Sequence, residues 1–323
     1  MTQVQKLRLW LGNKLETTQL GLCLTPNNIA IALVSKQKEG KPKLSLCQYY
    51  PDTSFDNQLE ILVNLTKQHH LKRFPCFIVL ALGQYDVHMI PKPEVKQDEI
   101  RDAIRWQLSE LINYPIEKTV IDYFDLPDSQ NITRKNMLGA VVCRQDIINR
   151  LTNQFQQTGL NLESIDIQEL VLRNVTNLLP ENSRGIALLK INQNNGLILI
   201  KKQSEIYLSR TLGIGLKHLG ICDSILQDDN HRKALNQLAL EIQRSLDYYE
   251  SFYGLPQIPD IFVAPMPEYT ELLCNQLKTH HGISARLLDI THSLNCESEL
   301  SFVDQAHCLS AIGAALTHFK PVH

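Results

Sequence analysis

Two carboxylates lie close enough in the sequence to act together as an acid and a base. Asp122 and Asp125 fall within the short extended stretch TVIDYFDL at 119–126. A catalytic carboxylate pair could supply both proton donor and proton acceptor. On a short strand beside aromatic residues, however, carboxylates more commonly face solvent and pair with a cross-strand Lys or Arg. We therefore predict ion pairing for both residues.

A group of glycines superficially resembles a phosphate-binding loop. Gly213, Gly215 and Gly220 lie in GIGLKHLG, but their spacing differs from that of phosphate loops, and the stretch opens a helix only loosely. A tight strand-to-helix turn is the better interpretation. The sequence also contains no GxSxG, HExxH or Walker motif and no Cys–His pattern typical of a nucleophile. These patterns indicate no enzyme class.

Cysteine and histidine could bind a metal, but their spacing argues against it. The chain has 8 cysteines without a CxxC motif, and most have apolar neighbours. Reduced cysteines that serve as small hydrophobic residues have this pattern. The pairs His69–His70 and His280–His281 each fall at the end of an expected helix, where adjacent residues point to different sides. We predict no metal site.

Length and composition narrow the class of protein. The chain has 323 residues, 43% of them hydrophobic, which excludes a disordered protein and suggests about two domains. Nucleic-acid-binding proteins usually carry a basic excess, whereas 32 Lys and Arg here face 34 Asp and Glu, so no nucleic-acid partner is expected. No apolar run reaches the roughly 18 residues that cross a bilayer, and the amino-terminal residues lack the apolar core of a signal peptide. We expect a cytoplasmic protein.

The elements that would position any site follow a pattern that occurs twice. Each copy is a meander of three expected strands, at 20–24, 29–35 and 43–50 in the first and at 186–191, 197–202 and 205–212 in the second. A helical pattern and another buried strand follow each meander, with FIVLAL (77–82) after the first and DIFVA (260–264) after the second. The helices are expected near 56–70 and at 232–253. Two α/β domains built on related plans would produce this order.

Residues 84–155, between the two copies, have a different character. A helix from Asp98 to about Asn113 has one apolar stripe, and Pro115 closes it. The other expected elements are strands at 85–90, 119–126 and 137–143 and a helix at 145–157. This order predicts a small α+β subdomain inserted in the first half.

The expected elements divide the chain into four parts. They are a leader at 1–17, a first domain at 18–83 with 156–184, an inserted subdomain at 84–155, and a second domain at 185–323 with a helical insertion at about 216–255. A final helix near 303–318 contains the small-residue run SAIGAAL, which would permit close packing on a sheet.

With duplicated meanders and an inserted subdomain, the chain resembles the actin-like superfamily, and within it the PilM/MshI family of type IV pilus biogenesis proteins. The resemblance rests on EIRDAIRWQLSELINYPIEKTVIDYFDL (99–126), EIQRSLDYYES (241–251) and SAIGAAL (310–316). The first stretch is the most specific, because it combines an aromatic-containing helix, a proline turn and a short acidic-aromatic strand. The resemblance implies an α/β fold of duplicated RNase H-like domains.

The resemblance also implies a role. It is that of a non-catalytic cytoplasmic scaffold, peripheral to the bacterial inner membrane, in a type IV pilus assembly complex of the MSHA (mannose-sensitive haemagglutinin) type. Family members bind the short amino-terminal tail of a bitopic inner-membrane protein in a groove between the first domain and its inserted subdomain. The candidate contributors are Tyr85, Val87, Trp106, Tyr114 and Tyr123, although each by itself is more commonly a core residue. A pilus ATPase and a second copy of the chain are partners left open, and an actin-like component of type II secretion is an alternative assignment.

The phosphate-binding turns of actin-like ATPases can be compared with this sequence. In those enzymes two strand–turn–strand loops surround the phosphates, glycines let amides approach, and a carboxylate holds a metal through water. In the first turn Cys23 matches the family's Asp, Thr25 matches the Gly, and Pro26 lacks an amide hydrogen. In the second turn Lys190 replaces the Asp and Asn192 the Gly. Neither turn supplies a carboxylate for a metal.

The residues that would contact the adenosine of a nucleotide include one feature that favours binding and one that opposes it. The family's Gly-Gly turn corresponds to APMP at 264–267, where Ala264 has a side chain and two prolines remove donors. Glu241 and Arg244 resemble the purine clasp of the superfamily, although an i,i+3 pair on a helix surface is the more common explanation. We predict no ATP hydrolysis and no cofactor; if nucleotide binds at all, these two residues are expected to hold it. A protein that uses ATP with Mg as a conformational switch is the alternative.

The leader contains a basic apolar segment, KLRLWLGNKL at 6–15. Its Lys6, Arg8 and Lys14 alternate with Trp10 and leucines, a composition that suits the interface of a bilayer with anionic lipid. Packing against its own domain or against a partner is the other interpretation, and the sequence leaves both open.

Overall fold

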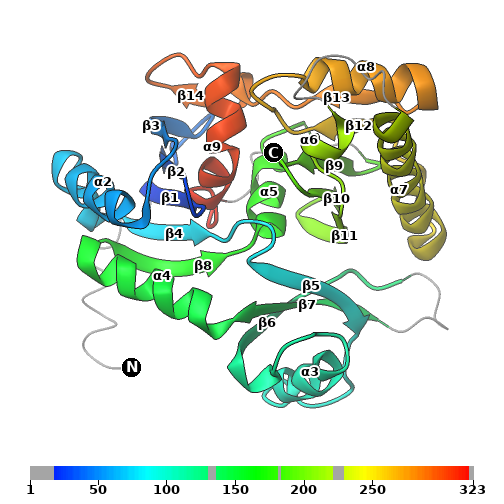
Figure 1. Ribbon diagram of the computed structural model, residues 1–323, viewed down its shortest axis with the longest axis horizontal. Coiled ribbons are helices and arrows are strands. Elements are labelled where there is room, and N and C mark those ends of the chain that lie inside the picture. The colour runs from blue at the N-terminus through cyan, green and yellow to red at the C-terminus, as the bar shows by residue number, and fades with distance from the viewer. Residues whose placement is uncertain (1–17, 130–135, 181–182, 221–228, 320–323) are drawn as a thin grey trace. The chain divides into compact units, whose positions relative to one another are not determined.

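The computed structural model describes residues 18–129, 136–180, 183–220 and 229–319 (Figure 1). Contacts divide the chain into two compact units. Unit 1 comprises Met1–Ala81, Arg150–Leu179 and Asp289–His323, and unit 2 comprises Leu82–Asn149 and Pro180–Leu288. Among the described helices, none combines the length and apolar composition needed to cross a membrane.

Unit 1 is built on a six-stranded sheet with the order β14-β3-β2-β1-β4-β8. Strands β1 to β3 form an antiparallel meander, and β4 and β8 continue the sheet parallel to β1. The first expected meander is therefore confirmed. The strands are β1 (Thr18–Leu24), β2 (Ile29–Ser35), β3 (Lys43–Tyr50), β4 (Pro75–Val79), β8 (Asn161–Asp166) and β14 (Asn295–Cys296).

Two helices of unit 1 pack against each other and against the sheet. Helix α9 (Phe302–Ala314) lies directly on β1, because an added Cβ at Gly21 would be 1.9 Å from the carbonyl oxygen of Ala311. The close packing predicted for SAIGAAL is thus confirmed. Helix α5 (Gln168–Thr176) contacts α9 through Ser310, whose Oγ donates to Gln168 Oε1 at 2.7 Å. The remaining helices and 3-10 turns are α2 (Phe55–Gln68), η1 (Leu71–Arg73), α4 (Gln145–Thr158), which crosses the boundary between the units, and η3 (Thr291–Ser293).

The placement of α9 corrects the expected domain boundaries. Residues 289–323 were expected in the second domain, but β14 pairs with β3 and α9 covers β1 and β2, so these residues belong to unit 1. The inserted segment was expected to belong to the first domain, but residues 82–149 are part of unit 2. One direct link there is a hydrogen bond of 2.9 Å from Ser129 Oγ to the carbonyl oxygen of Phe252. The physical reason for the first correction is that the apolar face of the first sheet needs a cover, and the small residues of α9 fit it.

The main sheet of unit 2 repeats the plan of unit 1. Its order is β11-β10-β9-β12-β13, again an antiparallel meander followed by two parallel strands. This matches β3-β2-β1-β4-β8 in both order and direction, so the predicted duplication is confirmed. The strands are β9 (Ile186–Ile191), β10 (Gly196–Lys202), β11 (Glu205–Leu212), β12 (Ile261–Val263) and β13 (Ala285–Leu287).

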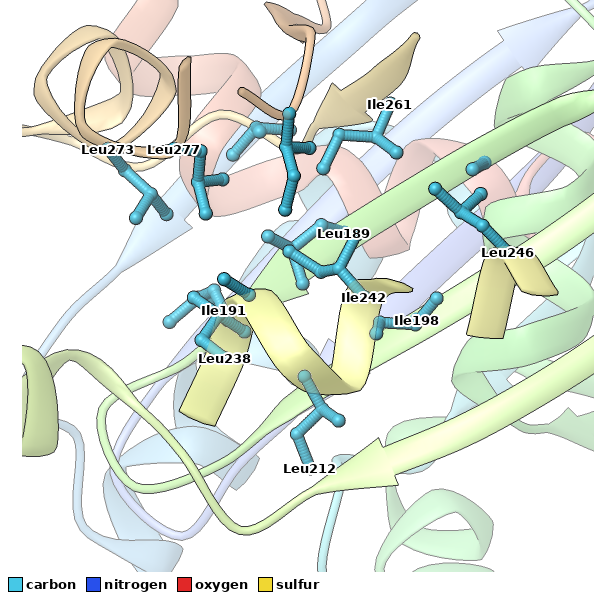
Figure 2. Packing of buried hydrophobic residues seen from close by; sticks show 14 of the residues in the cluster. Leu189, Ile191, Ile198, Leu212, Leu238, Ile242, Leu246, Ile261, Leu273 and Leu277 are labelled. Carbon is cyan, nitrogen blue, oxygen red and sulfur yellow. The ribbon is translucent and has the colours of Figure 1, made fainter. Parts of the chain in front are cut away.

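The core of unit 2 forms where helix α7 (Asp229–Tyr253) packs on this sheet. Figure 2 shows Ile242 of α7 beside Leu189 and Ile198 of the strands, and Leu238 beside Ile191. A buried leucine or isoleucine of this kind contributes about 2 kcal/mol by removal of apolar surface from water. The helix ends where expected, at Gly254, which has a φ of +65°. The other helices are α6 (Leu216–Leu219) and α8 (Thr270–His281).

The inserted segment forms a small antiparallel sheet with one helix. Its strand order is β5-β7-β6, and α3 packs on one face. The expected elements are confirmed, although the helix is shorter than the predicted 98–113. The bounds are β5 (Tyr85–Pro91), α3 (Ile100–Ser109), η2 (Ile116–Lys118), β6 (Thr119–Asp125) and β7 (Met137–Arg144).

Candidate functional site

The two faces of the small sheet have different surroundings. Side chains alternate between the faces along a strand. In β7, Leu138, Ala140 and Val142 point to the α3 side, where they are buried against Ile104 and Leu108. The alternate residues of β7 therefore point to the opposite face.

That opposite face carries an apolar strip, which we define as Val87, Met89, Phe124, Gly139 and Val141. The register places Val87 beside Val141, and Met89 and Phe124 on either side of Gly139. The ring of Phe124 lies across the glycine, because an added Cβ at Gly139 would be 2.3 Å from Phe124 Cζ. The four side chains of the strip are only half-buried. A surface of this kind can take apolar side chains from a partner.

The strip runs to the edges of the sheet. Among the described strands, β5 and β6 each pair on one side only, with β7. Side chains on the α3 side engage β6, since Arg101 Nη2 is 3.1 Å from Asp122 Oδ1 and Gln97 Nε2 donates to Tyr123 Oη at 3.1 Å. The edge formed by β5 is the one on which Val87 and Met89 lie.

The five expected partner-binding residues do not form one site. Val87 belongs to the strip, and Tyr85 lies on the same face but is only 6% exposed. Tyr114 and Tyr123 pack against the core on the α3 side. Trp106 is 80% exposed on α3. The structure therefore distributes these residues over three surfaces.

Tyr114 has a structural contact. Its hydroxyl donates to Asp86 Oδ2 at 3.1 Å, and burial, together with the charge of Asp86, raises the pKa of Tyr114 to about 12. The sequence reasoning missed Met89, Phe124 and Val141. The alternation in YDVHMIP and MLGAVVC could have indicated them, once the pairing of the strands was known.

The expectation of ion pairing for the two carboxylates is confirmed, because each has a cationic partner. Asp125 Oδ1 is 2.7 Å from Lys92 Nζ, and Asp122 Oδ1 is 3.1 Å from Arg101 Nη2. Neither partner is the expected residue on a neighbouring strand, because Arg101 comes from α3 and Lys92 follows β5, which does not pair with β6. Both pairs lie on the surface, where the sequence placed these carboxylates.

The turn between β1 and β2 is held by side chains of its own unit. Gln58 Nε2 donates to the carbonyl oxygen of Thr25 at 2.9 Å. Thr53 Oγ1 donates to the carbonyl oxygen of Asn27 at 3.1 Å. The amide of Asn27 donates to Thr25 Oγ1 at 3.4 Å, and Pro26 has no amide hydrogen. The turn thus directs these groups to protein partners.

The turn between β9 and β10 is held by backbone. The amide of Leu216 donates to the carbonyl oxygen of Asn192 at 2.9 Å. Gly215 lies directly on the turn, since an added Cβ would be 2.5 Å from the carbonyl carbon of Asn194 and 2.6 Å from the amide nitrogen of Asn195. The segment that begins α6 therefore covers the amides of this turn.

The glycines of that segment form the expected strand-to-helix turn. Gly215 is the N-cap of α6, and Gly220 is its C-cap with a φ of +63°. Glycine is favoured at a C-cap with positive φ because it has no Cβ.

The segment matching the adenosine-side turn is buried. Ala264 and Met266 are 2% and 3% exposed. The amide of Ala264 donates to the carbonyl oxygen of Leu189 at 2.8 Å, and that of Met266 donates to Thr270 Oγ1 at 2.9 Å. Both amides are used within the fold.

Glu241 is the centre of a small ion-pair network. Its Oε1 is 3.0 Å from Arg244 Nη1 on the same helix, the i,i+3 pair anticipated from the sequence. Its Oε2 is 3.1 Å from Arg210 Nη1 on β11, a contact that the sequence reasoning missed. Glu241 is the most buried member, with 22% of its side chain exposed. Two arginines thus hold the carboxylate proposed for a purine clasp.

Comparison with known proteins addresses the fold. No family model and no curated protein sequence matches the chain. A chain of the solved PilM–PilN type IV pilus biogenesis complex is 17% identical, with a TM-score of 0.72 over 94% of this chain and 99% of that one. The fold is PilM-like. Two more distant structures are the cytoplasmic domain of EpsL, an inner-membrane component of the type II secretion system of Vibrio cholerae (9% identity, TM-score 0.49, 95% and 98% covered), and a Bacteroides thetaiotaomicron protein with an actin-like ATPase fold (12%, 0.47, 86% and 95%).

The remaining sequence expectations can be placed on the PilM-like fold. Within the part of the chain that the structure describes, no three His, Cys, Asp or Glu residues are grouped to hold a metal ion. The described cysteines are free thiols, and several of them are buried, as their apolar neighbours predicted. The basic segment at 6–15 lies outside the described residues.

Proposed function

We propose that this chain is a non-catalytic scaffold of a type IV pilus assembly complex and that it holds the short cytoplasmic tail of an inner-membrane protein on the apolar strip. Two observations support the proposal: the PilM-like fold and the half-exposed strip beside a strand edge. The scaffold would act in the cytoplasm at the surface of the inner membrane. The finer assignment to an MSHA-type system rests on the sequence resemblance.

The strip suggests how a tail would bind. An extended peptide can add to an edge strand through backbone hydrogen bonds, while pockets for alternate side chains supply specificity. We assign this role to β5, where Val87 and Met89 would meet every second side chain of the peptide. A tail with apolar residues at alternate positions is therefore the expected ligand.

The test uses synthetic amino-terminal peptides of membrane proteins encoded near this chain. We expect one of them to bind the full chain, and Val87→Asp to weaken that binding at least about tenfold, because a charge would be buried beneath apolar side chains. Val303→Asp is the matched control, since Val303 is also exposed (47%) but lies on α9 in unit 1. Binding of no peptide, or equal binding by Val87→Asp and the unaltered chain, would contradict the proposal.

We further propose that the scaffold works without ATP. The support comes from the two strand turns, whose carbonyl groups accept hydrogen bonds from their own unit, and from the 264–267 segment, where the amides of Ala264 and Met266 are used within the fold. Calorimetric titration with Mg-ATP should show no binding in the micromolar range. A micromolar dissociation constant that is lost in Glu241→Ala would instead favour a nucleotide-dependent switch.

A further inference from the structure

Helix α9 and strand β3 bring two thiols of unit 1 together. The side chains of Cys47 on β3 and Cys308 on α9 are hydrogen-bonded to each other. Cys308 also lies against the backbone of the strand, since its Sγ is 3.5 Å from the carbonyl oxygen of Gln48. Two cysteines that are far apart in the sequence thus meet where the helix packs on the sheet.

A ring contact holds the same two elements together beside the thiols. The rings of Tyr49 on β3 and His307 on α9 are stacked, with centroids 3.9 Å apart and planes 7° from parallel. Cys47 and Tyr49 are two residues apart on one strand, so their side chains point to the same face. Adjacent residues of the helix therefore contact one face of β3, and this packing keeps the two thiols close.

Two other thiols of unit 1 are less well placed to bond to Cys47. Cys296 on β14 pairs with Leu44, which is three residues and about 10 Å along β3 from Cys47. Cys23 lies on β1, which is two strand spacings, about 10 Å, from β3. The Cα atoms of a disulfide are usually within about 7 Å of each other. Cys308 is therefore the favoured partner of Cys47.

Burial gives the two thiols different chemical roles. Cys47 is half-buried, whereas Cys308 is 0% exposed. The hydrogen bond with Cys47 and burial raise the pKa of Cys308, so this thiol keeps its proton. A small oxidant in solution can therefore reach and oxidise Cys47 first, and Cys308 is positioned to react second.

We propose that Cys47 and Cys308 form an oxidation site at which a hydroperoxide generates a disulfide between β3 and α9. First, the thiolate sulfur of Cys47 attacks one oxygen of hydrogen peroxide and the O–O bond breaks, which leaves Cys47 as a sulfenic acid and releases hydroxide, which takes up a proton to become water. Next, the sulfur of Cys308 attacks the sulfenic sulfur; the S–S bond forms, the S–O bond breaks, and the Cys308 proton leaves with the hydroxyl group as a second water. The two thiols lose two electrons, and the peroxide gains them.

The disulfide would fasten the helix that covers the first sheet. Helix α9 packs on β1, β2 and β3, and the new bond would close the long loop from residue 47 to residue 308. A cross-link that closes a long loop restricts the unfolded chain strongly. In a reducing compartment such bonds are transient. The site would therefore make α9 harder to open while peroxide is present, and reduction would reverse the effect.

The test treats the full chain with hydrogen peroxide and maps its disulfides by mass spectrometry after digestion without reductant. We expect a linked pair of peptides that contain Cys47 and Cys308, about 2 Da lighter than the two reduced peptides together and separated again by dithiothreitol. Hydrogen exchange of the α9 amides should slow at least about tenfold in the oxidised chain. No disulfide, a disulfide to Cys23 or Cys296 instead, or unchanged exchange in α9 would overturn the proposal.

The order of the two steps is tested with Cys308→Ala. Without its partner, the sulfenic acid of Cys47 should accumulate, and dimedone should label Cys47 at least about fivefold more than in the unaltered chain. Cys274→Ala is the matched control, since Cys274 is also buried (9%) but lies on α8 in unit 2, and this variant should form the disulfide as the unaltered chain does. Equal labelling of Cys47 in the two variants would overturn the proposal. The apolar strip of unit 2 keeps its residues in both variants, so peptide binding there reports separately on the proposed function.

Discussion

The two main sheets share their strand order and directions but differ at the turn that follows the first strand of each meander. In unit 1, side chains of Thr53 and Gln58 hold the carbonyl groups of the turn. In unit 2, the backbone at Gly215 and Leu216 lies against it. The same position in a duplicated plan is therefore held in two ways. In unit 1 side-chain hydrogen bonds add to a backbone bond of 2.6 Å from the Thr53 amide to the carbonyl oxygen of Asn27, and in unit 2 the backbone of another segment packs closely on the turn.

The difference matters because the two kinds of closure respond differently to mutation. A side-chain hydrogen bond can be deleted by one substitution, which leaves a part-buried carbonyl without that donor. A backbone contact can be removed only by forcing the segments apart, because it depends on the absence of a side chain.

The largest change in the free energy of unfolding is expected where Gly215 packs on the turn between β9 and β10. Gly215→Ala should lower the free energy of unfolding by about 3 kcal/mol, because the new methyl group would overlap the backbone of Asn194. Gly213→Ala in the same segment is the control, since an added Cβ there has no atom within 4 Å. Urea unfolding of both variants measures the difference. Equal stability of the two would show that the second turn is not closed by backbone packing.

A smaller change in the free energy of unfolding is expected where Gln58 holds the turn between β1 and β2. Gln58 is 3% exposed, and Gln58→Ala should cost about 2 kcal/mol, because the carbonyl oxygen of Thr25 loses a donor. Gln157→Ala, on the exposed surface of α4, should change stability by less than about 0.5 kcal/mol. If Gln58→Ala has no more effect than this control in thermal or urea unfolding, side chains do not maintain the first turn.

The smallest change in stability is expected at β8 and β13, the last strands in the order that the two main sheets share. β8 ends at Asp166 and β13 at Leu287, so only unit 1 has a carboxyl group there. Burial raises the pKa of Asp166, although Ser164 and Thr317 hydrogen-bond to it. The folded state therefore keeps this proton to a higher pH than the unfolded state does. The stabilisation is fully present below the ordinary pKa of 3.8 and is lost as the pH rises through the raised value.

Asp166→Asn should remove this contribution, so stability should fall less steeply with pH in the variant than in the unaltered chain. Urea unfolding at several values between about pH 4 and pH 8 would measure the two slopes. Parallel pH profiles would show that ionisation of Asp166 is equally costly in both states.

Much of the fold could be predicted because its signals are local. The alternation and turn residues of 29–35 and 197–202 placed both meanders within a few residues of their observed bounds. The position of α9 could not be predicted in this way. Its apolar and small residues show that it is buried, but they do not say which of two sheets it covers.

The candidate site shows a similar limit. Tyr123 and Phe124 are adjacent aromatic residues on one strand, and only the register with β7 shows that Phe124 joins the apolar strip while Tyr123 packs toward α3. Trp106 was singled out for its residue type. Its separate surface became evident only when Ile104 and Leu108 were seen to face the small sheet.

Helix α9 comes late in the sequence but packs on the sheet of unit 1, and this has a consequence for biosynthesis. The sheet begins at Thr18, but the helix that covers β1 and β2 starts only at Phe302. The ribosome therefore synthesises all of the residues between β1 and Phe302 before that apolar surface can be shielded. Nascent chains would expose it throughout elongation, which makes them candidates for chaperone capture, and premature termination before Phe302 would leave a product prone to aggregation.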